Sequence, residues 1–457
     1  MSALWTSDEI AAAVGGVAYG AFSATSVTFD SREVEAGSLF IALKGDVTDG
    51  HRFVAKAFEA GAAGALVSEP VDGPHVLVED SMAALNALAV ASRLRSSAKR
   101  IGVTGSVGKT GTKEALADAL ARANRGLVHR SVKSYNNHTG VPLSECRMPR
   151  EAVFGVFEMG MNHFGELAEL TQLVRPHVAL VTTIAPAHIE YFGTEERIAD
   201  AKGEIFSGLE PGGVAVIPYD SPHRERLIAA ARHYAARIVT FGRAAEADVT
   251  ALEVIPKAQG THILARLPGA ELSFTLSQPG DHWVSNALGV LAAVQAVGGD
   301  LAAAGLALAD MAGLAGRGAR HSITLADGGT ATLLDESYNA NSASMRATLS
   351  VLATLPAERR IAVLGEMREL GSASEQLHAE LAGPVVDAGV ALAILVGEGM
   401  APLARALAGQ CETVHVATAE AAHETLKGAI RGGDALLIKG SNAVGLSRIV
   451  NALTSGS

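Results

Sequence analysis

Cysteine is scarce in this sequence, and so are aromatic residues. The 457 residues include two cysteines, Cys146 and Cys411, which lie far apart along the chain. Two separated cysteines exclude a disulfide framework and predict a reducing compartment, so we expect a cytoplasmic protein. Aromatic residues make up 4% of the chain and hydrophobic residues 48%. Cores of this composition must be built from Ala, Val, Leu and Ile.

Excess positive charge and long apolar runs are missing as well. The net charge is −11 and the pI is about 5.8, which excludes the basic surface expected for binding nucleic acid or an anionic membrane. The longest apolar run, around residues 388–396, is far shorter than the ~18 residues that a membrane span needs. Asp8 and Glu9 in the first ten residues predict that no signal peptide is present. No apolar interface stripe is evident, which favours a monomer.

Residues 99–121 are the most informative stretch, because a β-branched run, a glycine turn and a run of helix formers follow one another. This order predicts a phosphate site, where backbone N–H groups and the positive helix end face the anion. Lys109 would reach the β- and γ-phosphates, and the Thr110 hydroxyl would bind Mg²⁺. The usual fingerprint has a glycine where this chain has Val103, and an ordinary helix start is the alternative. The predicted loop consists of Thr104, Gly105, Ser106, Val107, Gly108, Lys109 and Thr110.

The length and the pattern of the chain predict an α/β protein of several domains. A size of about 150 residues per domain suggests two to four domains for this length. We expect a small α/β domain at 1–98, a central domain at 99–318 with a mostly parallel sheet, and a second parallel α/β sheet at 319–457. Alternating residues at 248–276 predict a small antiparallel addition to the central sheet.

Polar side chains follow several of the predicted strands. Glu158 and His188 each come directly after a hydrophobic run. The carboxyl edge of a parallel sheet is where such folds bind ligands, so both could join the phosphate loop, although each could also be an ordinary loop residue. Lys202 lies among small residues on a predicted helix, with a solvated lysine as the alternative. His282 and Asn286 are four residues apart and could share a helix face.

Short motifs of this kind run along almost the whole chain. They are Asp-Ser-Arg at 30–32, Leu-Phe-Ile-Ala-Leu-Lys-Gly at 39–45, the phosphate loop, Asn-Asn at 136–137, Gly-Val-Pro at 140–142, Glu-Met-Gly at 158–160, Ala-Pro-Ala-His at 185–188, Ala-Lys-Gly-Glu at 201–204, Asn286, Gly-Arg at 316–317, Asp-Glu-Ser-Tyr-Asn-Ala-Asn at 335–341, Leu-Gly-Glu-Met-Arg-Glu-Leu-Gly at 364–371 and Lys-Gly-Ser at 439–441. In this order they resemble the motifs of the Mur ligase family.

The resemblance implies a first domain that holds a UDP-sugar, a central P-loop ATPase, and a Rossmann-like C-terminal domain that closes over the amino substrate. One Mg²⁺ would bind Thr110 and Glu158. A second would bind His188 and an N-carboxylated Lys202, because carbamylation turns a cation into an oxygen ligand suited to Mg²⁺. The implied catalytic residues are Lys109, His188 and Lys202. The implied ATP contacts beyond the phosphate loop are Asn137, Asn286, Arg317 and Asp335, and the implied substrate contacts are Ser31, Arg32, Lys44, Gly45, Tyr338, Asn339 and Asn341.

The motifs at 337–341 and 364–371 are typical of the family member that adds D-alanyl-D-alanine to UDP-N-acetylmuramoyl-tripeptide. The resemblance therefore implies ATP-driven amide formation through an acyl phosphate, in peptidoglycan synthesis. The alternatives are a sibling ligase that adds diaminopimelate or lysine, a folylpolyglutamate synthase, and a nucleotide-binding protein without catalysis. Asn442 and Ser342 stand where the family commonly has arginine and proline, which leaves the amino-substrate contacts open. The third residue of the stem peptide is open as well.

Overall fold

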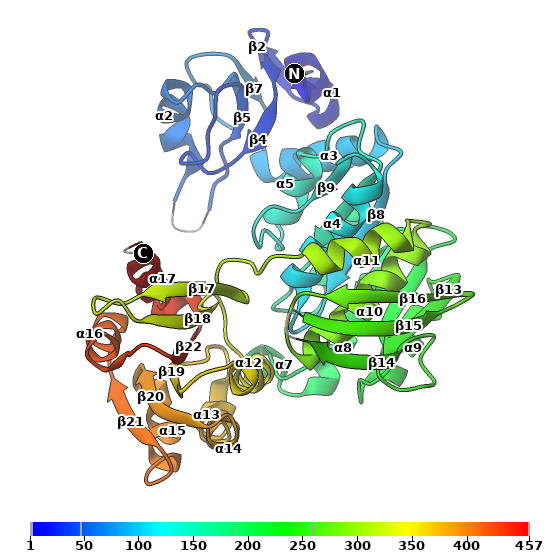
Figure 1. The fold of residues 1–457 in the computed structure, drawn as a ribbon. Helices are drawn as coiled ribbons and strands as arrows, with labels where there is room; N and C mark the ends of the chain where they lie inside the picture. Colours follow the sequence, from blue (N-terminus) through cyan, green and yellow to red (C-terminus); the bar gives the residue numbers. More distant parts are fainter. Residues whose placement is uncertain (1–2, 46–47, 188, 258–259, 456–457) are drawn as a thin grey trace.

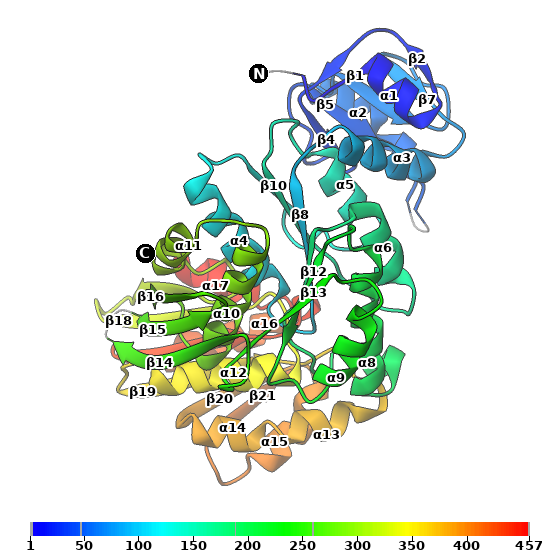
Figure 2. The ribbon, with the colours of Figure 1, turned by 90° about the vertical axis from the view of Figure 1, so that its right-hand side faces the viewer.

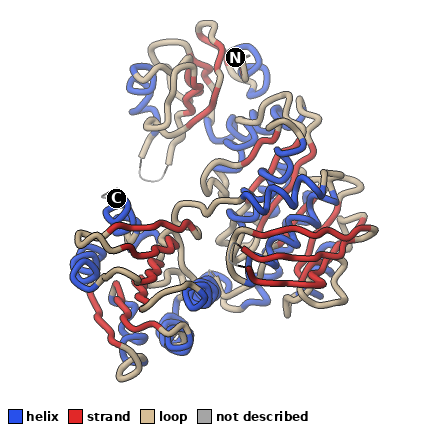
Figure 3. The backbone as a smooth tube through the Cα atoms, in the orientation of Figure 1, coloured by secondary structure: helices blue, strands red, loops and turns tan. Residues whose placement is uncertain are grey.

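The computed structural model describes residues 3–45, 48–187, 189–257 and 260–455. These residues form three units that follow one another along the chain, each built on its own β-sheet (Figures 1 and 3). In the view of Figure 1 the first unit lies at the top, the second at the right and the third at the lower left. The predicted succession of three α/β units is confirmed. None of the helices in these ranges is long and apolar enough to cross a membrane.

The first unit contains a five-stranded sheet in the order β2-β7-β6-β5-β4, in which β2 is antiparallel to β7 and the other neighbours are parallel. Helix α1 begins at a capping box, because the Thr6 hydroxyl accepts from the N–H of Glu9 and the Glu9 carboxylate accepts from the N–H of Thr6. The elements are β1 (Trp5–Thr6), α1 (Ser7–Val14), β2 (Val17–Tyr19), β3 (Ser23–Ala24), β4 (Ser26–Thr28), β5 (Ser38–Ile41), α2 (Val54–Glu59), β6 (Gly64–Val67), β7 (His75–Leu77) and α3 (Ser81–Leu94).

The second unit contains a nine-stranded sheet in the order β16-β15-β14-β13-β12-β11-β8-β10-β9. Strands β8 to β14 pair in parallel, and β15 and β16 continue the sheet antiparallel, which confirms the addition predicted at 248–276. Its elements are β8 (Lys99–Thr104), α4 (Lys109–Ala123), β9 (Val128–Arg130), α5 (Gly140–Cys146), β10 (Phe154–Glu158), α6 (Glu166–Val174), β11 (Val178–Val181), α7 (Ile189–Phe192), α8 (Glu195–Gly203), β12 (Val214–Pro218), α9 (Arg224–Ala231), β13 (Arg237–Gly242), β14 (Val249–Lys257), β15 (Gly260–Leu267), β16 (Ala270–Leu276), α10 (Asp281–Ala296) and α11 (Leu301–Asp310).

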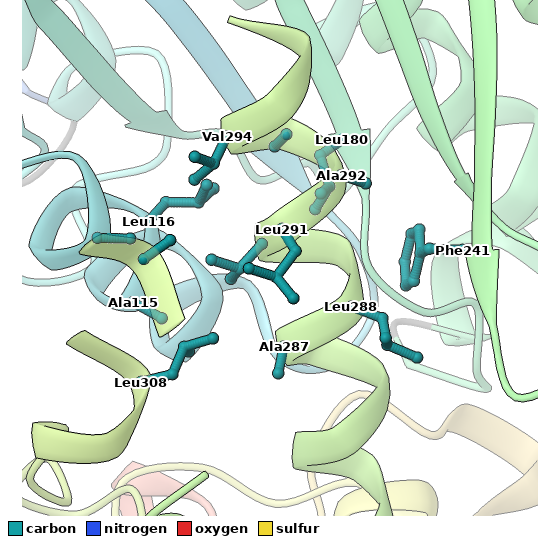
Figure 4. Packing of buried hydrophobic residues seen from close by; sticks show 14 of the residues in the cluster. Ala115, Leu116, Leu180, Phe241, Ala287, Leu288, Leu291, Ala292, Val294 and Leu308 are labelled. Carbon is teal, nitrogen blue, oxygen red and sulfur yellow. The ribbon is translucent and has the colours of Figure 1, made fainter. Parts of the chain in front are cut away.

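Helix α10 forms the centre of the core on one face of this sheet. Ala, Leu and Val residues lie almost all round it, and a helix that is apolar on all sides is buried. Figure 4 shows Leu291 between side chains of α4, including Leu116, and Leu308 of α11, while Leu288 points toward Phe241 of the sheet. Helices α6, α8 and α9 cover the opposite face with a second cluster of mainly aliphatic residues. The aliphatic cores expected from the low aromatic content are therefore present.

The third unit contains a six-stranded sheet in the order β17-β18-β22-β19-β20-β21, which is parallel except for β17. Helices cover both faces of the sheet, as predicted for a second parallel α/β domain (Figure 2). The elements are β17 (Ala319–Thr324), β18 (Thr330–Glu336), α12 (Ser342–Thr354), β19 (Arg359–Gly365), α13 (Ser374–Ala379), α14 (Ala382–Asp387), β20 (Val390–Val396), α15 (Ala401–Ala406), β21 (Glu412–Val416), α16 (Ala419–Ala429), β22 (Asp434–Lys439) and α17 (Ser447–Thr454).

The first two units share part of a core. Helix α5 belongs to the second stretch of the chain, yet its Leu143 and Cys146 are buried in the apolar cluster of the first unit. The indole N–H of Trp5 donates to the carbonyl of Cys146 at 2.9 Å, and the hydroxyl of Ser92 donates to the carbonyl of Glu145 at 2.6 Å. The sheet of the first unit ends before residue 98, whereas its apolar core also includes side chains of α5 from the second stretch of the chain.

Candidate active site

The predicted phosphate loop lies between β8 and α4. Val103, which stands in place of the first glycine of the usual fingerprint, is a buried residue of β8 and pairs with Glu158 and Leu180 on the neighbouring strands. The strand therefore continues one residue further, and the turn begins at Gly105. A Cβ at Gly105 would lie 1.9 Å from the Thr182 hydroxyl, so only glycine fits there. The loop ends at the N-terminus of α4, where backbone N–H groups can receive an anion.

The half-buried Lys109 of this loop and the buried Lys202 line the same cavity. The Nζ of Lys109 donates to the carbonyl of Gly105 at 2.6 Å, and burial lowers the pKa of Lys109 while Glu158 opposes that shift. Lys202, near the end of α8, is 1% exposed and lines the same cavity, so the alternative of a solvated lysine is wrong. Burial lowers the pKa of Lys202 well below its usual value, and the nearby charge of Lys109 adds to this effect. An anion bound here would relieve the repulsion between the two groups.

Glu158 ends β10 and is 1% exposed. Its Oε1 accepts from the side-chain amide of Asn136 at 2.7 Å. Its Oε2 is buried and has no hydrogen-bond partner among the described residues. An uncompensated carboxylate oxygen beside a phosphate loop, with Thr110 also lining the cavity, is the oxygen environment that suits Mg²⁺. Groups of three or more His, Cys, Asp or Glu side chains that could hold a metal ion do not occur in the described part of the chain.

The third unit supplies the opposite wall. Arg317, in the connection just before β17, lies on this wall with its guanidinium 4.2 Å from the ring centroid of Tyr338, and it donates to the Ser134 hydroxyl at 3.1 Å. The cavity between the two walls has a volume of about 370 Å³. Further residues of the third unit that line it are Glu336, Asn339, Asn341 and Lys439, and further residues of the second are His282, Trp283 and Asn286.

Asp335 and Asn341 have their side chains engaged in local structure. Asp335 accepts from the N–H of Gly316 at 2.6 Å and from the hydroxyl of Ser337 at 2.7 Å, so it fixes the loops around Arg317 and Tyr338. The side-chain oxygen of Asn341 accepts from the N–H of Ser344 at 2.9 Å and caps α12. Asn286 is 7% exposed and lies beside Gly108.

Several predicted residues lie away from this cavity. The side-chain oxygen of Asn137 accepts from the N–H of Gly140 at the start of α5, and the neighbouring Asn136 reaches the cavity in its place. In the first unit Arg32 pairs with Asp30 at 2.6 Å, and Lys44 pairs with Glu69 at 2.7 Å. Because the Asn137 side chain contacts the start of α5, the structure adds no support for a contact between Asn137 and the nucleotide. The other first-unit residues predicted to bind substrate are Ser31 and Gly45, and His188 lies outside the described residues.

The sequence placed Asn136, Glu336 and Lys439 in motifs and His282 on a helix face with Asn286, but assigned none of them, nor Ser134 or Trp283, to the site, although all of them line the cavity. For Glu336 and Lys439 a signal was available, because each is the last residue of a hydrophobic strand. For Trp283 and Ser134 the local sequence contains no such signal.

A glycine loop with one half-buried and one buried lysine, facing a second parallel sheet across one cavity, defines a nucleotide-dependent enzyme built from three α/β units. Models of the Mur ligase family match all three units: "Mur ligase family, catalytic domain" at residues 23–98, "Mur ligase middle domain" at 103–294, and "Mur ligase, glutamate ligase domain" at 320–442. The chain belongs to the Mur ligase family.

Individual relatives match over nearly the full length. The UDP-N-acetylmuramoyl-tripeptide--D-alanyl-D-alanine ligase of Rickettsia prowazekii (strain Madrid E) is 31% identical over 98% of this chain and 99% of its own. The ligase of the same name from Escherichia coli (strain K12) is 35% identical over 94% and 93%. The crystal structure of MurF from Acinetobacter baumannii superposes with a TM-score of 0.84 at 29% identity, covering 99% of both chains. The MurF ligase of Thermotoga maritima, in complex with ADP, gives a TM-score of 0.78 at 25% identity, covering 94% and 97%.

Proposed function

We propose that this chain adds D-alanyl-D-alanine to UDP-N-acetylmuramoyl-tripeptide, with ATP converted to ADP and phosphate, in the synthesis of the peptidoglycan precursor. The observation that supports this most directly is the full-length similarity to ligases of that name, at 31% and 35% identity. A diaminopimelate ligase of the family superposes with a TM-score of 0.52 at 18% identity, against 0.84 for the Acinetobacter MurF. The dipeptide is therefore the favoured amino substrate.

The second unit would hold ATP. The loop N–H groups and Lys109 would bind its phosphates, Asn286 would face the adenine, and Arg317 would reach the phosphates from the other wall. Asp335 would contact the ribose only if its bond to the N–H of Gly316 is given up or shared, since that bond is 2.6 Å long. The ADP complex of the Thermotoga enzyme supports the use of an adenine nucleotide.

Mg²⁺ would be held by Thr110, Glu158 and the nucleotide, with a second ion near Lys202 and His188. The Oε2 of Glu158 is buried without a hydrogen-bond partner in the described ranges, and it fits the first ion. The chemistry of Lys202 fits carbamylation, because an amine must be neutral to react with carbon dioxide and burial lowers the pKa of this amine. The ions would neutralise charge on the transferred phosphoryl group.

The reaction would run in two steps. The terminal carboxylate of the tripeptide attacks the γ-phosphate and forms an acyl phosphate, and the amine of the dipeptide then attacks the acyl carbon while phosphate leaves. Phosphoryl transfer needs mainly positioning and charge neutralisation, which Lys109 and Arg317 can supply. Closure of the third unit would exclude water from the acyl phosphate. The first unit would hold the UDP-sugar near Ser31, Arg32, Lys44 and Gly45, and Tyr338, Asn339 and Asn341 would contact the amino substrate.

The test is phosphate release from Mg·ATP and UDP-N-acetylmuramoyl-tripeptide, with D-alanyl-D-alanine, diaminopimelate or lysine offered in turn. Both forms of the tripeptide, with diaminopimelate or lysine as third residue, should be compared. Release that depends on D-alanyl-D-alanine alone supports the proposal, and release with another amine assigns the chain to a sibling reaction. Sedimentation at enzyme concentration tests the expectation of a monomer, and cell fractionation tests the expectation of a cytoplasmic enzyme.

A further inference from the structure

An ion pair between a buried lysine and a half-buried glutamate lines the cavity, and none of the roles proposed above uses it. Glu336 ends β18 and Lys439 ends β22, and the two residues are partners in the parallel register of these strands. The Nζ of Lys439 is 3.5 Å from Oε2 of Glu336. The side chain of Lys439 is 2% exposed and that of Glu336 is 17% exposed, so the carboxylate is the more accessible of the two from the cavity.

The groups that face Glu336 come from several elements. Lys439 of β22 and Arg317, which precedes β17, are positive, while Asp335 of its own strand is negative. His282 of α10 faces Lys439 from the other side of the cavity. Lys439 also donates to the carbonyl of Asn339 at 2.9 Å, so it holds both the carboxylate and the loop that follows β18.

The second step of the proposed reaction requires a proton acceptor. A peptide amine has a pKa of about 7.7–8.0, so it is largely an ammonium ion at neutral pH and has no free electron pair. When nitrogen attacks the acyl phosphate, an N–C bond forms, the C–O bond to phosphate breaks, and phosphate departs with that electron pair. One proton must leave the ammonium ion before the attack and a second must leave after it.

Two carboxylates line the cavity among the residues that the structure describes, and they lie on opposite walls. Glu158 is beside the phosphate loop and is bonded to Asn136, where a cation would occupy it. Glu336 is on the wall of the third unit, next to Asn339 and Tyr338. We propose that Glu336 accepts the first of these protons, from the ammonium group of the incoming dipeptide, while the departing phosphate takes the second, and that Lys439 is a positioning residue for this carboxylate. This inference rests on the proposed function.

The acidities in the cavity agree with this assignment. Burial raises the pKa of Glu336, and the positive charges of Lys439 and Arg317 oppose the shift. Burial lowers the pKa of His282 to about 4, and Lys439 adds to that effect. Proton transfer is most efficient when the pKa of the acceptor is near the working pH, so the raised carboxyl is the better acceptor of the two.

The experiment compares two nucleophiles on wild type and Glu336→Gln. D-Alanyl-D-alanine needs an acceptor for the proton of its ammonium group, whereas hydroxylamine is already neutral at pH 7 and loses only the second proton, which the phosphate takes, when it forms a hydroxamate. We expect Glu336→Gln to lower the rate with the dipeptide about 6- to 11-fold at pH 7, because only about a tenth of an amine with a pKa of 7.7–8.0 is neutral at that pH. The residual rate should increase with pH as the amine deprotonates in solution, and hydroxamate formation should stay within about threefold of wild type.

Lys439→Met tests the positioning role through the pH profile. Without the ammonium group the pKa of Glu336 should increase, so the acid limb of the kcat profile should move to higher pH. Lys439→Arg should restore the limb, because it restores the charge. A purely structural role would lower the rate at every pH without moving the limb.

Asp434→Asn is the matched control. Asp434 begins β22, at the far end from Lys439, and its buried carboxylate pairs with Arg359 at 2.7 Å outside the cavity. This variant should keep its rates with both nucleophiles, and thermal unfolding reports whether each variant is folded. Two results with Glu336→Gln would overturn the inference and leave the proposed function standing. One is an equal loss of rate with both nucleophiles, and the other is an unchanged rate with the dipeptide. Failure of the wild type to form any hydroxamate would instead refute the proposed function, and the inference with it.

Discussion

A methyl group at residue 105 should weaken nucleotide binding by a predictable amount. Gly105 has φ +149°, and an ideal Cβ would lie 1.9 Å from the hydroxyl oxygen of Thr182. That hydroxyl donates to the carbonyl of Val107 at 2.5 Å and is 3.3 Å from the carbonyl of Thr104, so it ties β11 to both ends of the loop. Gly105→Ala would displace Thr182 and release the loop from the conformation that presents its N–H groups.

The cost has two parts. The single hydrogen bond that the Thr182 hydroxyl can donate contributes about 0.5–1.5 kcal/mol, and alanine at a positive φ costs roughly 1–2 kcal/mol. Because the empty loop can relieve the clash by moving, most of this cost should appear in nucleotide binding rather than in global unfolding. A loss of about 1.5–3.5 kcal/mol corresponds to binding that is roughly 10- to 300-fold weaker.

Calorimetric titration with Mg·ADP measures this loss directly. Gly126→Ala is the control, because Gly126 also has a positive φ, +76°, but has no atom within 4 Å of its ideal Cβ. The control should bind ADP like wild type. The double variant Gly105→Ala with Thr182→Ala should bind more tightly than the sum of the two single effects predicts, since the clash is counted only once. An ADP affinity of Gly105→Ala within about threefold of wild type would refute the reasoning.

Three further outcomes are expected. Lys109→Ala should lower the rate of phosphate release by at least about 10²-fold, while the midpoint of thermal unfolding stays near that of wild type. Activity close to wild type would refute the role of Lys109 in binding the phosphates. Leu291→Ala, in the centre of the core of Figure 4, should cost about 2.7–5 kcal/mol in urea unfolding, against about 0.5 kcal/mol or less for Leu306→Ala on α11, whose side chain is 56% exposed. Burial raises the pKa of Glu145 to about 8 from 4.5, and neither carboxylate oxygen has a hydrogen-bond partner among the described residues. The stability contributed by the protonated form is fully present below pH 4.5 and is lost as the pH increases through 8. The free energy of urea unfolding of wild type should therefore fall across this window by a few kcal/mol more than that of Glu145→Gln. An equal dependence on pH in the two proteins would contradict this pKa assignment.

Local pattern was sufficient to predict the sheets and one wall of the site. Hydrophobic runs ending in polar residues located the carboxyl edges of the parallel strands, and Glu158 and the phosphate loop do meet at one such edge. The glycine turn could be recognised despite Val103, because a β-branched strand and a run of helix formers flank it. These features depend on neighbours in sequence, which is why the sequence alone carries them.

Other features depend on packing between distant segments. Asn136 and Asn137 are adjacent and chemically identical, and only the direction of the loop before α5 decides which one reaches Glu158. The burial of Lys202 arises from the helices and strands around α8, whereas its own neighbours in sequence are also compatible with exposure. Glu336 and Lys439 lie across the cavity from the phosphate loop because of how the third unit packs against the second. No single sequence motif encodes that packing.

The apolar cluster that α5 shares with the first unit determines how this chain could be divided or recombined. A chimera that exchanges residues 1–98 alone would place foreign side chains against Leu143 and Cys146, and it would lose the bond from Trp5 to the carbonyl of Cys146. The transferable module is therefore discontinuous and consists of the first unit together with α5. Among relatives at about 30% identity, substitutions in the first unit that contact α5 should be accompanied by substitutions in α5.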